Sequence, residues 1–515
     1  MMPARKSDDV IDLQQLLKGI VKVNDKDNRP VTGLSLNSRT LQQGDLFCAL
    51  AGHKEHGLNY AAQAIQAGAC AVIWEANTQQ DDVVMLDSLS KHVPLIPVVN
   101  LKQQLGLVAE RFYGEPSQQL FMVGITGTNG KTSCSQFLAQ ALNHDDPSCV
   151  IGTLGNGFVD QMQQATHTTP DAITLHKLLA EFRDQEAKNV VMEVSSHGLQ
   201  QGRVSGVNFN VAIFTNLSRD HLDYHGDMSA YGNAKKLLFE MPGVKTAIIN
   251  VDDEFGVQLA DSLDNKLEVI RYGIAHHDKR IDVRASKVRL DNAGIHFDVI
   301  SRWGSGIVSS PLLGQFNVSN LLAVLSALLC KGVRFEEALL RVSRLTNVSG
   351  RMERIASSQL STLFVVDYAH TPDALAKALQ SLRKHMDRKK HAQLWCVFGC
   401  GGDRDQGKRP HMGEVAEQYA DHVIITDDNP RTEAASHIVA QILRGVLKQQ
   451  DVTVIHDRIA AIQHAITQAG EHDVVLVAGK GHEAYQIIGE EKRPYAGDLE
   501  VIEKLLGQSP NTSGD

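Results

Sequence analysis

Cysteine is scarce in this sequence and never paired. The 515 residues hold seven cysteines, and no two of them form a Cys-x-x-Cys motif; they are Cys48, Cys70, Cys134, Cys149, Cys330, Cys396 and Cys400. An odd and scattered set argues against a disulfide framework and against a cysteine-rich zinc site. We expect all seven to be reduced and most of them to be buried.

Long apolar runs are also missing. No segment approaches the roughly 18 consecutive apolar residues that a membrane-spanning helix needs. The N-terminal segment MMPARKSDDVIDLQQ has none of the apolar character of a secretory signal. These two observations predict a cytoplasmic protein without membrane insertion.

The sequence has no run of five or six like charges, and its net charge is −9, from 51 Lys and Arg against 60 Asp and Glu. A nucleic-acid partner held by a basic stripe is therefore disfavoured. Small molecules are the expected substrates.

The length and the alternation of short apolar runs with helical stretches predict an α/β protein of three domains. The first domain, residues 1–113, is a smaller α/β domain with strands at Asp45–Ala49, Ala71–Trp74 and Leu95–Val99 and a helix at Tyr60–Gln66. No internal repeat is present.

The second predicted domain, residues 114–350, has the pattern of a mononucleotide-binding domain. Its expected elements are strands at Leu120–Thr126, Asn189–Val194 and Val211–Thr215 and helices at Ser133–Leu142 and Asn320–Cys330. The third, residues 351–515, is expected to be Rossmann-like, with strands at Leu363–Asp367, Leu394–Phe398, His422–Thr426 and Val474–Ala478. Polar or Gly-rich residues follow these strands, where open α/β sheets bind ligands.

The strongest motif is Gly127-Thr128-Asn129-Gly130-Lys131-Thr132, between a predicted strand and a predicted helix. Glycines let backbone N–H groups approach phosphate oxygens, the lysine reaches the terminal phosphates, and the threonine hydroxyl can bind Mg²⁺. Ile125 stands where the usual phosphate loop has its first glycine, which disfavours an ordinary GTPase or transport ATPase. The alternative is an accidental Gly-rich turn before a helix.

Glu193, at the end of a predicted strand, is a candidate Mg²⁺ ligand; otherwise it is a surface carboxylate. Asn216–Gly226 concentrates Asp220, His221, Asp223 and His225 after another strand. His221 and His225 have the spacing of a zinc pair on a helix, but capping or packing histidines are the stronger alternative. From the residue types alone, we interpret Lys235 and Lys236 as a pair of solvated lysines on a helix.

Four further segments follow predicted strands. Asp367–Pro372 is either a nucleotide-side cluster or a capped helix start. Arg404 in a Gly-rich loop and Arg431 in Asp428-Asn429-Pro430-Arg431 suit a carboxylate ligand, because a guanidinium pairs with it through two hydrogen bonds. Glu483 in Gly479–Glu483 offers a partner for an ammonium group. Together these residues suggest a pocket for a zwitterionic amino acid with an additional charged end, although each arginine could be only a surface ion pair.

These motifs resemble the Mur ligases, ATP-dependent amino-acid ligases of peptidoglycan precursor synthesis. The resemblance covers nearly the whole chain, from Leu36–Arg39 and Gly44–Phe47 to Gly479–Glu483, and it includes the segments GTNGKT, EVSSHGL, NLSRDHLDYHG, FNVSN, GRME, DYAHTPDAL, GCGGDRD and DNPR. Within the family the chain is most similar to the members that add meso-diaminopimelate.

The resemblance implies an ATP-dependent acid–amino-acid ligase. ATP would phosphorylate the D-glutamyl γ-carboxylate of UDP-N-acetylmuramoyl-L-alanyl-D-glutamate, and the amine of diaminopimelate would attack the acyl phosphate. The expected products are the tripeptide, ADP and phosphate, and Mg²⁺ would assist the phosphoryl transfer. A monomer is expected.

The resemblance also assigns site residues. The catalytic ones would be Lys131, Glu193, His221 and Lys235, with Mg²⁺ held by Thr132, Glu193, His221 and a carbamylated Lys235, which replaces the solvated-lysine interpretation. ATP would contact Gly127, Thr128, Asn129, Gly130, Lys131, Thr132, Ser133, Asn317, Asn320, Arg351 and Asp367. The UDP-muramoyl dipeptide would contact Leu36, Ser38, His53, Lys54, Glu55, His167, Thr168, Thr169, Ser195, Gln201 and Arg203. Diaminopimelate would contact Arg404, Asp428, Asn429, Pro430, Arg431, Gly479 and Glu483.

Two positions depart from the family pattern, with His167 in place of the usual asparagine and Ser133 in place of a second threonine.

Two alternative functions stay open. One is a folylpolyglutamate synthetase, which should lack the DNPR segment and the N-terminal block. The other is a nucleotide-gated binding protein that hydrolyses ATP slowly without ligation.

Overall fold

The computed structural model describes residues 10–52, 55–76, 93–165, 167–263, 265–274, 280–291, 293–356, 362–386, 391–481 and 483–507. The chain forms two compact units. The first holds Met1–Val283 with Leu322–Val333, and the second holds Arg284–Leu321 with Arg334–Asp515. The boundaries predicted near residues 113 and 350 stay predictions.

The first unit begins with a small parallel sheet. Its order is β3 (Gly33–Ser35), β4 (Asp45–Ala49), β5 (Ala71–Glu75) and β6 (Leu95–Val98). The three predicted strands and the predicted helix, now α2 (Ala61–Gln66), are confirmed, whereas β3 and α4 (Leu101–Phe112) were not predicted. Near the N-terminus, β1 (Ile11–Asp12) pairs with β2 (Pro30–Val31) beside α1 (Leu13–Leu16).

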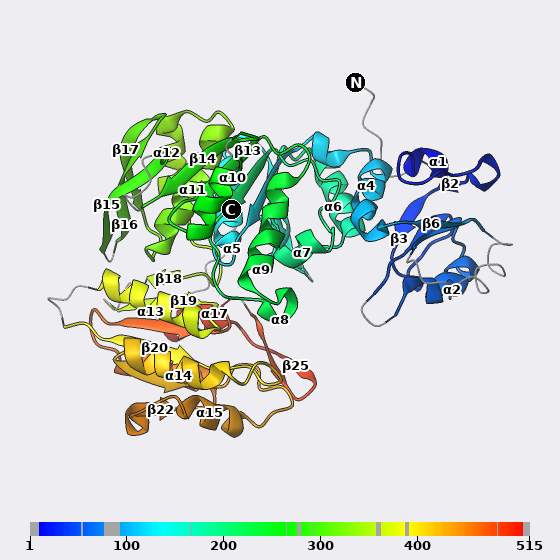
Figure 1. Ribbon diagram of the computed structural model, residues 1–515. Helices are drawn as coiled ribbons and strands as arrows, with labels where there is room; N and C mark the ends of the chain where they lie inside the picture. Colours follow the sequence, from blue (N-terminus) through cyan, green and yellow to red (C-terminus); the bar gives the residue numbers. More distant parts are fainter. Residues whose placement is uncertain are drawn as a thin grey trace. The chain divides into compact units, whose positions relative to one another are not determined.

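A larger sheet carries the phosphate-loop motif (Figure 1). Its strands in the first unit run in the order β10-β9-β8-β11-β7-β12-β13-β14, parallel from β8 to β14. Strand β7 thus lies between β11 and β12, so the residues after these three strands emerge at one edge of the sheet. The bounds are β7 (Phe121–Thr126), β8 (Ser148–Gly152), β9 (Gly155–Phe158), β10 (Gln161–Gln163), β11 (Asn189–Glu193), β12 (Val211–Phe214), β13 (Thr246–Asn250) and β14 (Glu268–Gly273).

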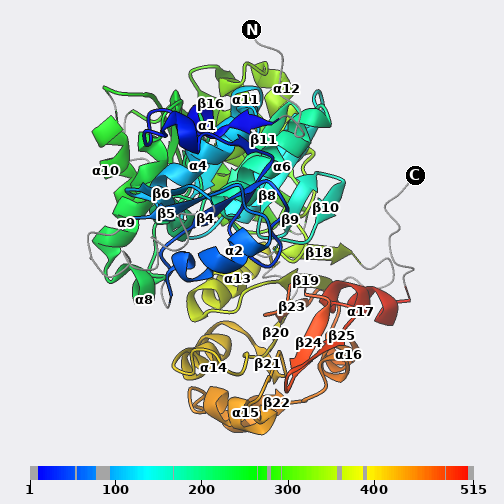
Figure 2. The same cartoon turned by 90° about the vertical axis from the view of Figure 1, so that its right-hand side faces the viewer.

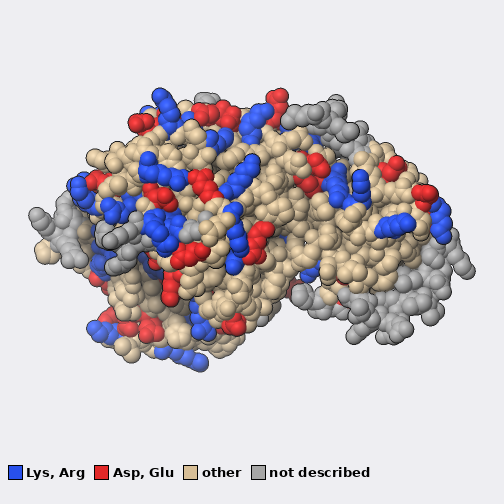
Figure 3. Space-filling view, turned by 45° about the horizontal axis from the view of Figure 1, so that its top comes forward, with Lys and Arg blue, Asp and Glu red and all other residues tan. Residues whose placement is uncertain are grey.

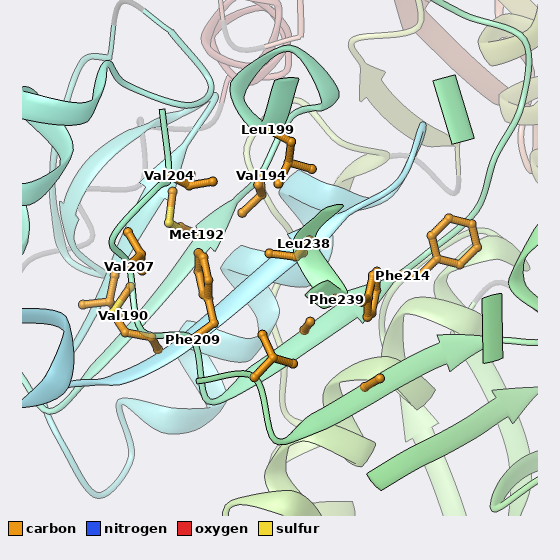
Figure 4. Close-up of a cluster of buried hydrophobic side chains, with 14 of the residues drawn as sticks. Val190, Met192, Val194, Leu199, Val204, Val207, Phe209, Phe214, Leu238 and Phe239 are labelled. Atoms are coloured by element: carbon orange, nitrogen blue, oxygen red, sulfur yellow. The ribbon is translucent and has the colours of Figure 1, made fainter. Parts of the chain in front are cut away.

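The central strands are buried on both faces, which explains their continuous apolar runs. On one face, side chains of β7, β11 and β12 pack against α6 (Ala172–Asp184) and α10 (Glu254–Leu263). Figure 4 shows part of this core, where Val190 and Met192 of β11 lie near Phe209 and Leu238. On the other face, α5 (Lys131–Leu142) packs on β8 and β11. The predicted strands and helix here are confirmed within two residues at each end.

The second unit contains a six-stranded sheet in the order β18-β19-β23-β20-β21-β22. All but the edge strand β18 are parallel. Helices cover both faces (Figure 2): α13, α14 and α15 on one, α16 and α17 on the other. The bounds are β18 (Glu353–Ala356), β19 (Leu363–Asp367), β20 (Leu394–Phe398), β21 (His422–Ile425), β22 (Val452–Val454), β23 (Val474–Ala478), α13 (Pro372–His385), α14 (Lys408–Tyr419), α15 (Ala435–Leu443), α16 (Arg458–Gln468) and α17 (Asp498–Leu505).

The four strands predicted for this sheet are therefore confirmed. Further elements of the second unit are the antiparallel pair β16 (Gly294–Ser301) and β17 (Gly304–Ser310), the hairpin of β24 (Tyr485–Ile488) and β25 (Glu491–Pro494), and α12 (Phe335–Ser343). Strand β15 (Val283–Asp291) lies almost wholly in this unit. Helix α11 (Phe316–Cys330) begins in the second unit and ends in the first.

Helices long and apolar enough to cross a membrane are not found among the described residues. The seven cysteines are free, and five of them are buried. Positive and negative side chains are interspersed on the face drawn in Figure 3. On this face, therefore, no broad region of a single charge sign is available to attract an anionic ligand.

A buried hydrogen bond joins α4 to α6, which lie side by side in Figure 1. His176 Nδ1 is 2.7 Å from Glu110 Oε2, and both side chains are almost completely buried. His176 Nε2 donates to the Ser205 carbonyl at 2.9 Å. Gly106 of α4 touches the same carbonyl so closely that a Cβ atom there would overlap it. Helix α4 and the segment around Ser205 are thus tightly packed together.

Replacing one member of this pair should be costly. We expect His176→Phe to lower the free energy of unfolding by about 2 kcal/mol, because the buried Oε2 of Glu110 loses its hydrogen bond to His176. The exposed pair Lys377–Asp373 provides the control, and Lys377→Ala should cost less than about 1 kcal/mol. Urea unfolding of both variants measures the difference. If His176→Phe and Lys377→Ala lowered the free energy of unfolding by the same small amount, the buried contact would not stabilise the fold as expected.

Candidate active site

The phosphate-loop motif forms a tight turn between β7 and α5. Gly130 precedes the first residue of α5 and adopts a φ of 87°, a left-handed conformation that glycine adopts without strain. A Cβ atom at Gly127 would overlap Thr215 Oγ1, so only glycine fits there. Lys131 Nζ donates to the carbonyls of Gly127 and Thr128 at 2.8 and 2.9 Å. The strand, turn and helix required for a phosphate loop are all present, and the accidental-turn alternative loses its support.

Glu193, at the carboxyl end of β11, is 1% exposed, so its interpretation as a surface carboxylate is wrong. Its Oε2 accepts hydrogen bonds from Thr132 Oγ1 at 2.9 Å and Thr153 Oγ1 at 3.2 Å, and its Oε1 accepts one from the Thr153 backbone at 2.8 Å. Thr153 Oγ1 is also 3.0 Å from Thr168 Oγ1. The carboxylate therefore links the phosphate-loop threonine to the segment around Thr168.

Lys235 of α9 (Met228–Lys236) is 1% exposed, and its interpretation as a solvated surface lysine is wrong. Its Nζ donates to the Gly127 carbonyl at 2.9 Å and lies 4.1 Å from the centre of the Tyr231 ring. Burial, helped by the nearby charge of Lys131, holds the pKa of Lys235 well below its usual value, while Asp220 opposes the shift. The lysine thus faces the phosphate loop in a setting that favours the neutral amine.

His221 lies at the start of α8 (Leu222–His225) with a φ of 53°. Its side chain is about half exposed, and its Nε2 is 3.4 Å from Asp220 Oδ2. The ring contacts His197 at 5.0 Å and Tyr231 at 6.1 Å between ring centres. Tyr231 contacts both His221 and the side-chain nitrogen of Lys235, so the ring of Tyr231 links the two residues.

His225 is buried, and its Nε2 is 2.9 Å from Ser196 Oγ. This contact agrees with a packing role rather than with a zinc pair. Among the described residues, no group of three or more His, Cys, Asp or Glu side chains lies close enough to hold a metal ion. A magnesium ion does not need such a group, because it commonly takes one or two protein oxygens together with water and substrate phosphates. The adjacent oxygens of Thr132 and Glu193 fit that requirement.

The residues expected for the dipeptide are joined by hydrogen bonds. Thr169 Oγ1 donates to the Glu193 carbonyl at 3.0 Å and lies 3.1 Å from Ser195 Oγ. Arg203 donates from Nη1 to the Thr169 carbonyl at 2.9 Å and from Nη2 to Gln201 Oε1 at 2.7 Å. A continuous network of hydrogen bonds therefore runs from the phosphate loop through Glu193 to Arg203.

A cavity of about 230 Å³ opens beside this network. Its lining includes four residues expected to contact the muramoyl substrate, namely Leu36, His167, Gln201 and Arg203, together with Lys102 and Leu105 of α4. Ser38 lies outside this lining, and its Oγ donates to Gln63 Oε1 at 2.9 Å. Glu55 accepts a hydrogen bond from the Tyr60 hydroxyl at 2.6 Å. His53 and Lys54, also expected at the UDP end, lie outside the described residues.

In the second unit, the nucleotide-side candidates are mostly buried. Asp367 accepts backbone hydrogen bonds from Met352 and Ala369 at 2.7 and 2.8 Å; burial raises the pKa of its carboxyl group, and Arg351 opposes the shift. Asn317 and Asn320 of α11 are joined by a hydrogen bond of 2.8 Å.

The helix start predicted as an alternative after Asp367 is also present. The Thr371 side chain caps α13, and Pro372 occupies its first turn. A cap and a ligand site are compatible, so the segment keeps both interpretations.

The two arginines expected to read a carboxylate both have atoms near Gly401. A Cβ atom built there would lie 2.9 Å from Arg431 Nη1 and 3.7 Å from Arg404 Cγ. Arg431 has a φ of 51°, and its Nη1 donates to the Gly402 carbonyl at 2.8 Å. Arg404 is exposed. The fold thus brings the Arg431 guanidinium to the Gly-rich loop that carries Arg404.

Asp428, Asn429, Gly479 and Glu483 form a second cluster in the same unit. A Cβ atom at Gly479 would lie 2.9 Å from Asp428 Oδ2, and Asn429 Nδ2 donates to Glu483 Oε2 at 3.0 Å. Pro430 is buried between Asn429 and Arg431. These contacts bring together four residues expected to contact diaminopimelate, among them Glu483, the predicted partner of an ammonium group.

Sequence reasoning missed three side chains that organise these clusters. Thr153 belongs to no motif and was invisible to a search for motifs. Lys480 was visible only as the residue between two glycines, and its complete burial gave no signal in the sequence. Arg409 is also fully buried; it pairs with Glu433 through two hydrogen bonds of 2.8 Å and donates to the Gly401 carbonyl at 2.9 Å.

Comparison with known protein families agrees with this arrangement. Residues 30–113 match the model described as Mur ligase family, catalytic domain; residues 125–328 match Mur ligase middle domain; and residues 350–481 match Mur ligase, glutamate ligase domain. The chain belongs to the Mur ligase family and has its N-terminal, central and C-terminal domains.

Individual relatives are similar over almost their whole length. A UDP-N-acetylmuramoyl-L-alanyl-D-glutamate--2,6-diaminopimelate ligase from Coxiella burnetii is 47% identical over 92% of this chain and 96% of its own. The ligase of the same name from Pseudomonas aeruginosa is 46% identical over 92% and 94%. A solved structure of a ligase with this name superposes with a TM-score of 0.72 and 35% identity, covering 97% of this chain and 99% of the other.

The lowered pKa of Lys235 predicts a pH-dependent effect of replacing it. Between the lowered folded-state pKa and the usual value near 10.5, the unfolded chain binds one more proton than the folded one, so stability rises with pH. We therefore expect Lys235→Met to raise the melting temperature more at pH 7 than at pH 9.5, in buffer freed of carbon dioxide. Lys236→Met, at a partly exposed neighbour, is the control and should shift it little at either pH. If Lys235→Met raised the melting temperature equally at pH 7 and pH 9.5, the result would contradict a lowered pKa of Lys235.

Proposed function

We propose that this protein ligates meso-diaminopimelate to the γ-carboxylate of the D-glutamyl residue in UDP-N-acetylmuramoyl-L-alanyl-D-glutamate, using ATP and an acyl phosphate intermediate. The products are the UDP-muramoyl tripeptide, ADP and phosphate. The observation that carries the proposal is the hydrogen-bond network from Thr132 through Glu193 and Thr169 to Arg203, which joins a phosphate loop to a substrate cavity. The names of the relatives supply the substrates.

The chemistry requires activation of a poor acyl donor. A γ-carboxylate oxygen attacks the terminal phosphorus of ATP, and the bond to the ADP oxygen breaks. The amine of the incoming amino acid then attacks the acyl carbon, phosphate leaves, and the ammonium proton passes to solvent. Lys131 and the backbone N–H groups of the loop stabilise negative charge on the transferred group.

The oxygens of Thr132 and Glu193 would hold Mg²⁺, which when bound neutralises charge on the phosphates. His221 and Lys235 are further candidates for this site. The setting of Lys235 supports carbamylation, because the neutral amine is the form that adds carbon dioxide and burial disfavours the ammonium. Bicarbonate should then shift the pH 7 melting temperature of the wild-type protein and leave that of Lys235→Met unchanged.

In the second unit, Arg404 and Arg431 would pair with a carboxylate of diaminopimelate, and Asp428 and Glu483 would face an ammonium group. L-lysine lacks the distal carboxylate, so binding it would leave a guanidinium without its partner. This chemistry favours diaminopimelate. The proposed monomeric state and cytoplasmic location rest on the family alone.

Phosphate release tests the reaction class. With ATP and the UDP-muramoyl dipeptide, release should depend on meso-diaminopimelate and should be far slower with L-lysine or L-glutamate. Lys131→Ala should lower turnover by about a thousandfold or more, because it removes the cation nearest the transferred phosphoryl group, while circular dichroism stays unchanged. Phosphate release that does not depend on the dipeptide or the amino acid would favour a nucleotide-gated binding protein. A preference for glutamate as substrate with a folate acceptor would favour a folylpolyglutamate synthetase.

Replacing Arg431 tests the amino-acid pocket. Arg431→Ala should raise the KM for diaminopimelate by about 10–100-fold, because charge-assisted hydrogen bonds are lost, and should change the KM for ATP little. The preference over L-lysine should shrink in parallel. Arg493→Ala, which breaks an exposed contact with Glu491 in the same unit, is the matched control. Equal changes in the KM for both substrates would count against this assignment.

A further inference from the structure

Lys480 is a lysine buried as completely as a core residue, with no exposed surface. It follows β23, and its Nζ donates to Asn429 Oδ1 at 3.0 Å and to the Tyr485 carbonyl at 2.8 Å. The same nitrogen lies 3.7 Å from Asp428 Oδ1 and 3.6 Å from Glu483 Oε2. One ammonium group is therefore placed among the acidic and amide residues expected to contact the amino acid.

The contact with Lys480 fixes the orientation of Asn429. Asn429 Oδ1 accepts from Lys480 Nζ and from the Ile487 backbone at 2.9 Å, so the amide nitrogen has to point the other way. That nitrogen donates to Glu483 Oε2 at 3.0 Å. Lys480 thus acts on Glu483 both directly, through charge, and indirectly, through the Asn429 amide.

The charges near Lys480 are unequal in number. Asp428 and Glu483 supply two carboxylates, and Lys480 supplies one ammonium. Arg458 is a further cation that acts on Lys480, and it is already paired with Asp498 through two hydrogen bonds of 2.7 Å, with both side chains buried. This pair is neutral as a whole, so the cluster of Asp428, Glu483 and Lys480 keeps one net negative charge. Such a cluster suits a single ammonium group, because without Lys480 the buried carboxylate of Asp428 and the half-buried one of Glu483 would repel each other.

We propose that Lys480 is a positioning residue that orients Asn429 and Glu483 and leaves this cluster with the single negative charge that receives the ammonium of the incoming amino acid. The proposal rests on the proposed function and deepens it. It assigns Asn429 a connecting role, since its amide oxygen accepts from Lys480 and Ile487 and one of its two N–H groups donates to Glu483.

Steady-state kinetics of Lys480→Met and Lys480→Arg test this role. We expect Lys480→Met to raise the KM for diaminopimelate at least about tenfold, because the amide and carboxylate lose their fixed positions, while the KM values for ATP and the UDP-muramoyl dipeptide stay within about twofold. Lys480→Arg keeps the charge but cannot place one nitrogen between Asn429 Oδ1 and the Tyr485 carbonyl. Its KM for diaminopimelate should lie between those of the wild type and Lys480→Met.

Arg383→Met is the matched control, since it breaks an ion pair with Asp421 elsewhere in the same unit and should leave all three KM values unchanged. If Lys480→Met does not fold, Lys480→Arg carries the test, and a wild-type KM for diaminopimelate in that variant would overturn the proposal. Equal changes in all three KM values, or a lower melting temperature with unchanged KM values, would also overturn it. A wild-type protein that ligates no amino acid would instead overturn the proposed function, and this inference with it.

Discussion

A buried carboxylate has to accept hydrogen bonds, and the site in the first unit is organised around that requirement at Glu193. Its donors come from the start of α5 and from the turn after β8, and Thr169 donates to its backbone carbonyl. The order of the strands makes this possible, because β11 lies directly between β7 and β8. The hydrogen bonds of one buried residue therefore tie the phosphate loop to the turn after β8 and to Thr169.

Most of the strands predicted from the sequence are covered on both faces, but coverage alone did not make a strand predictable, because β8 and β13 are equally buried and were missed. A parallel strand between two layers of helices needs an uninterrupted apolar run, and β11, β12, β20 and β23 each have one. The loops that follow these strands could be assigned because the carboxyl ends of parallel strands share one edge. Strand β3, with the sequence GLS, has no such run and was missed.

The parts of the site that could not be predicted depend on contacts between distant segments. Lys235 resembles an ordinary helical lysine in the sequence, yet the phosphate loop, more than a hundred residues earlier, covers it. Thr153 donates hydrogen bonds to Glu193 only because β8 and β11 are neighbours in the sheet. Burial of a polar side chain is decided by these long-range neighbours, and no local pattern encodes it.

The contact of α4 with the segment around Ser205 also bears on the cavity beside Arg203. Lys102 and Leu105 of α4 belong to its lining, and so do Gln201 and Arg203. The Gly106 contact leaves no room for even a methyl group, and the Glu110–His176 hydrogen bond ties the same elements together. A larger side chain at position 106 would therefore force α4 away from the segment around Ser205. Such a change would alter the cavity without replacing any residue that lines it.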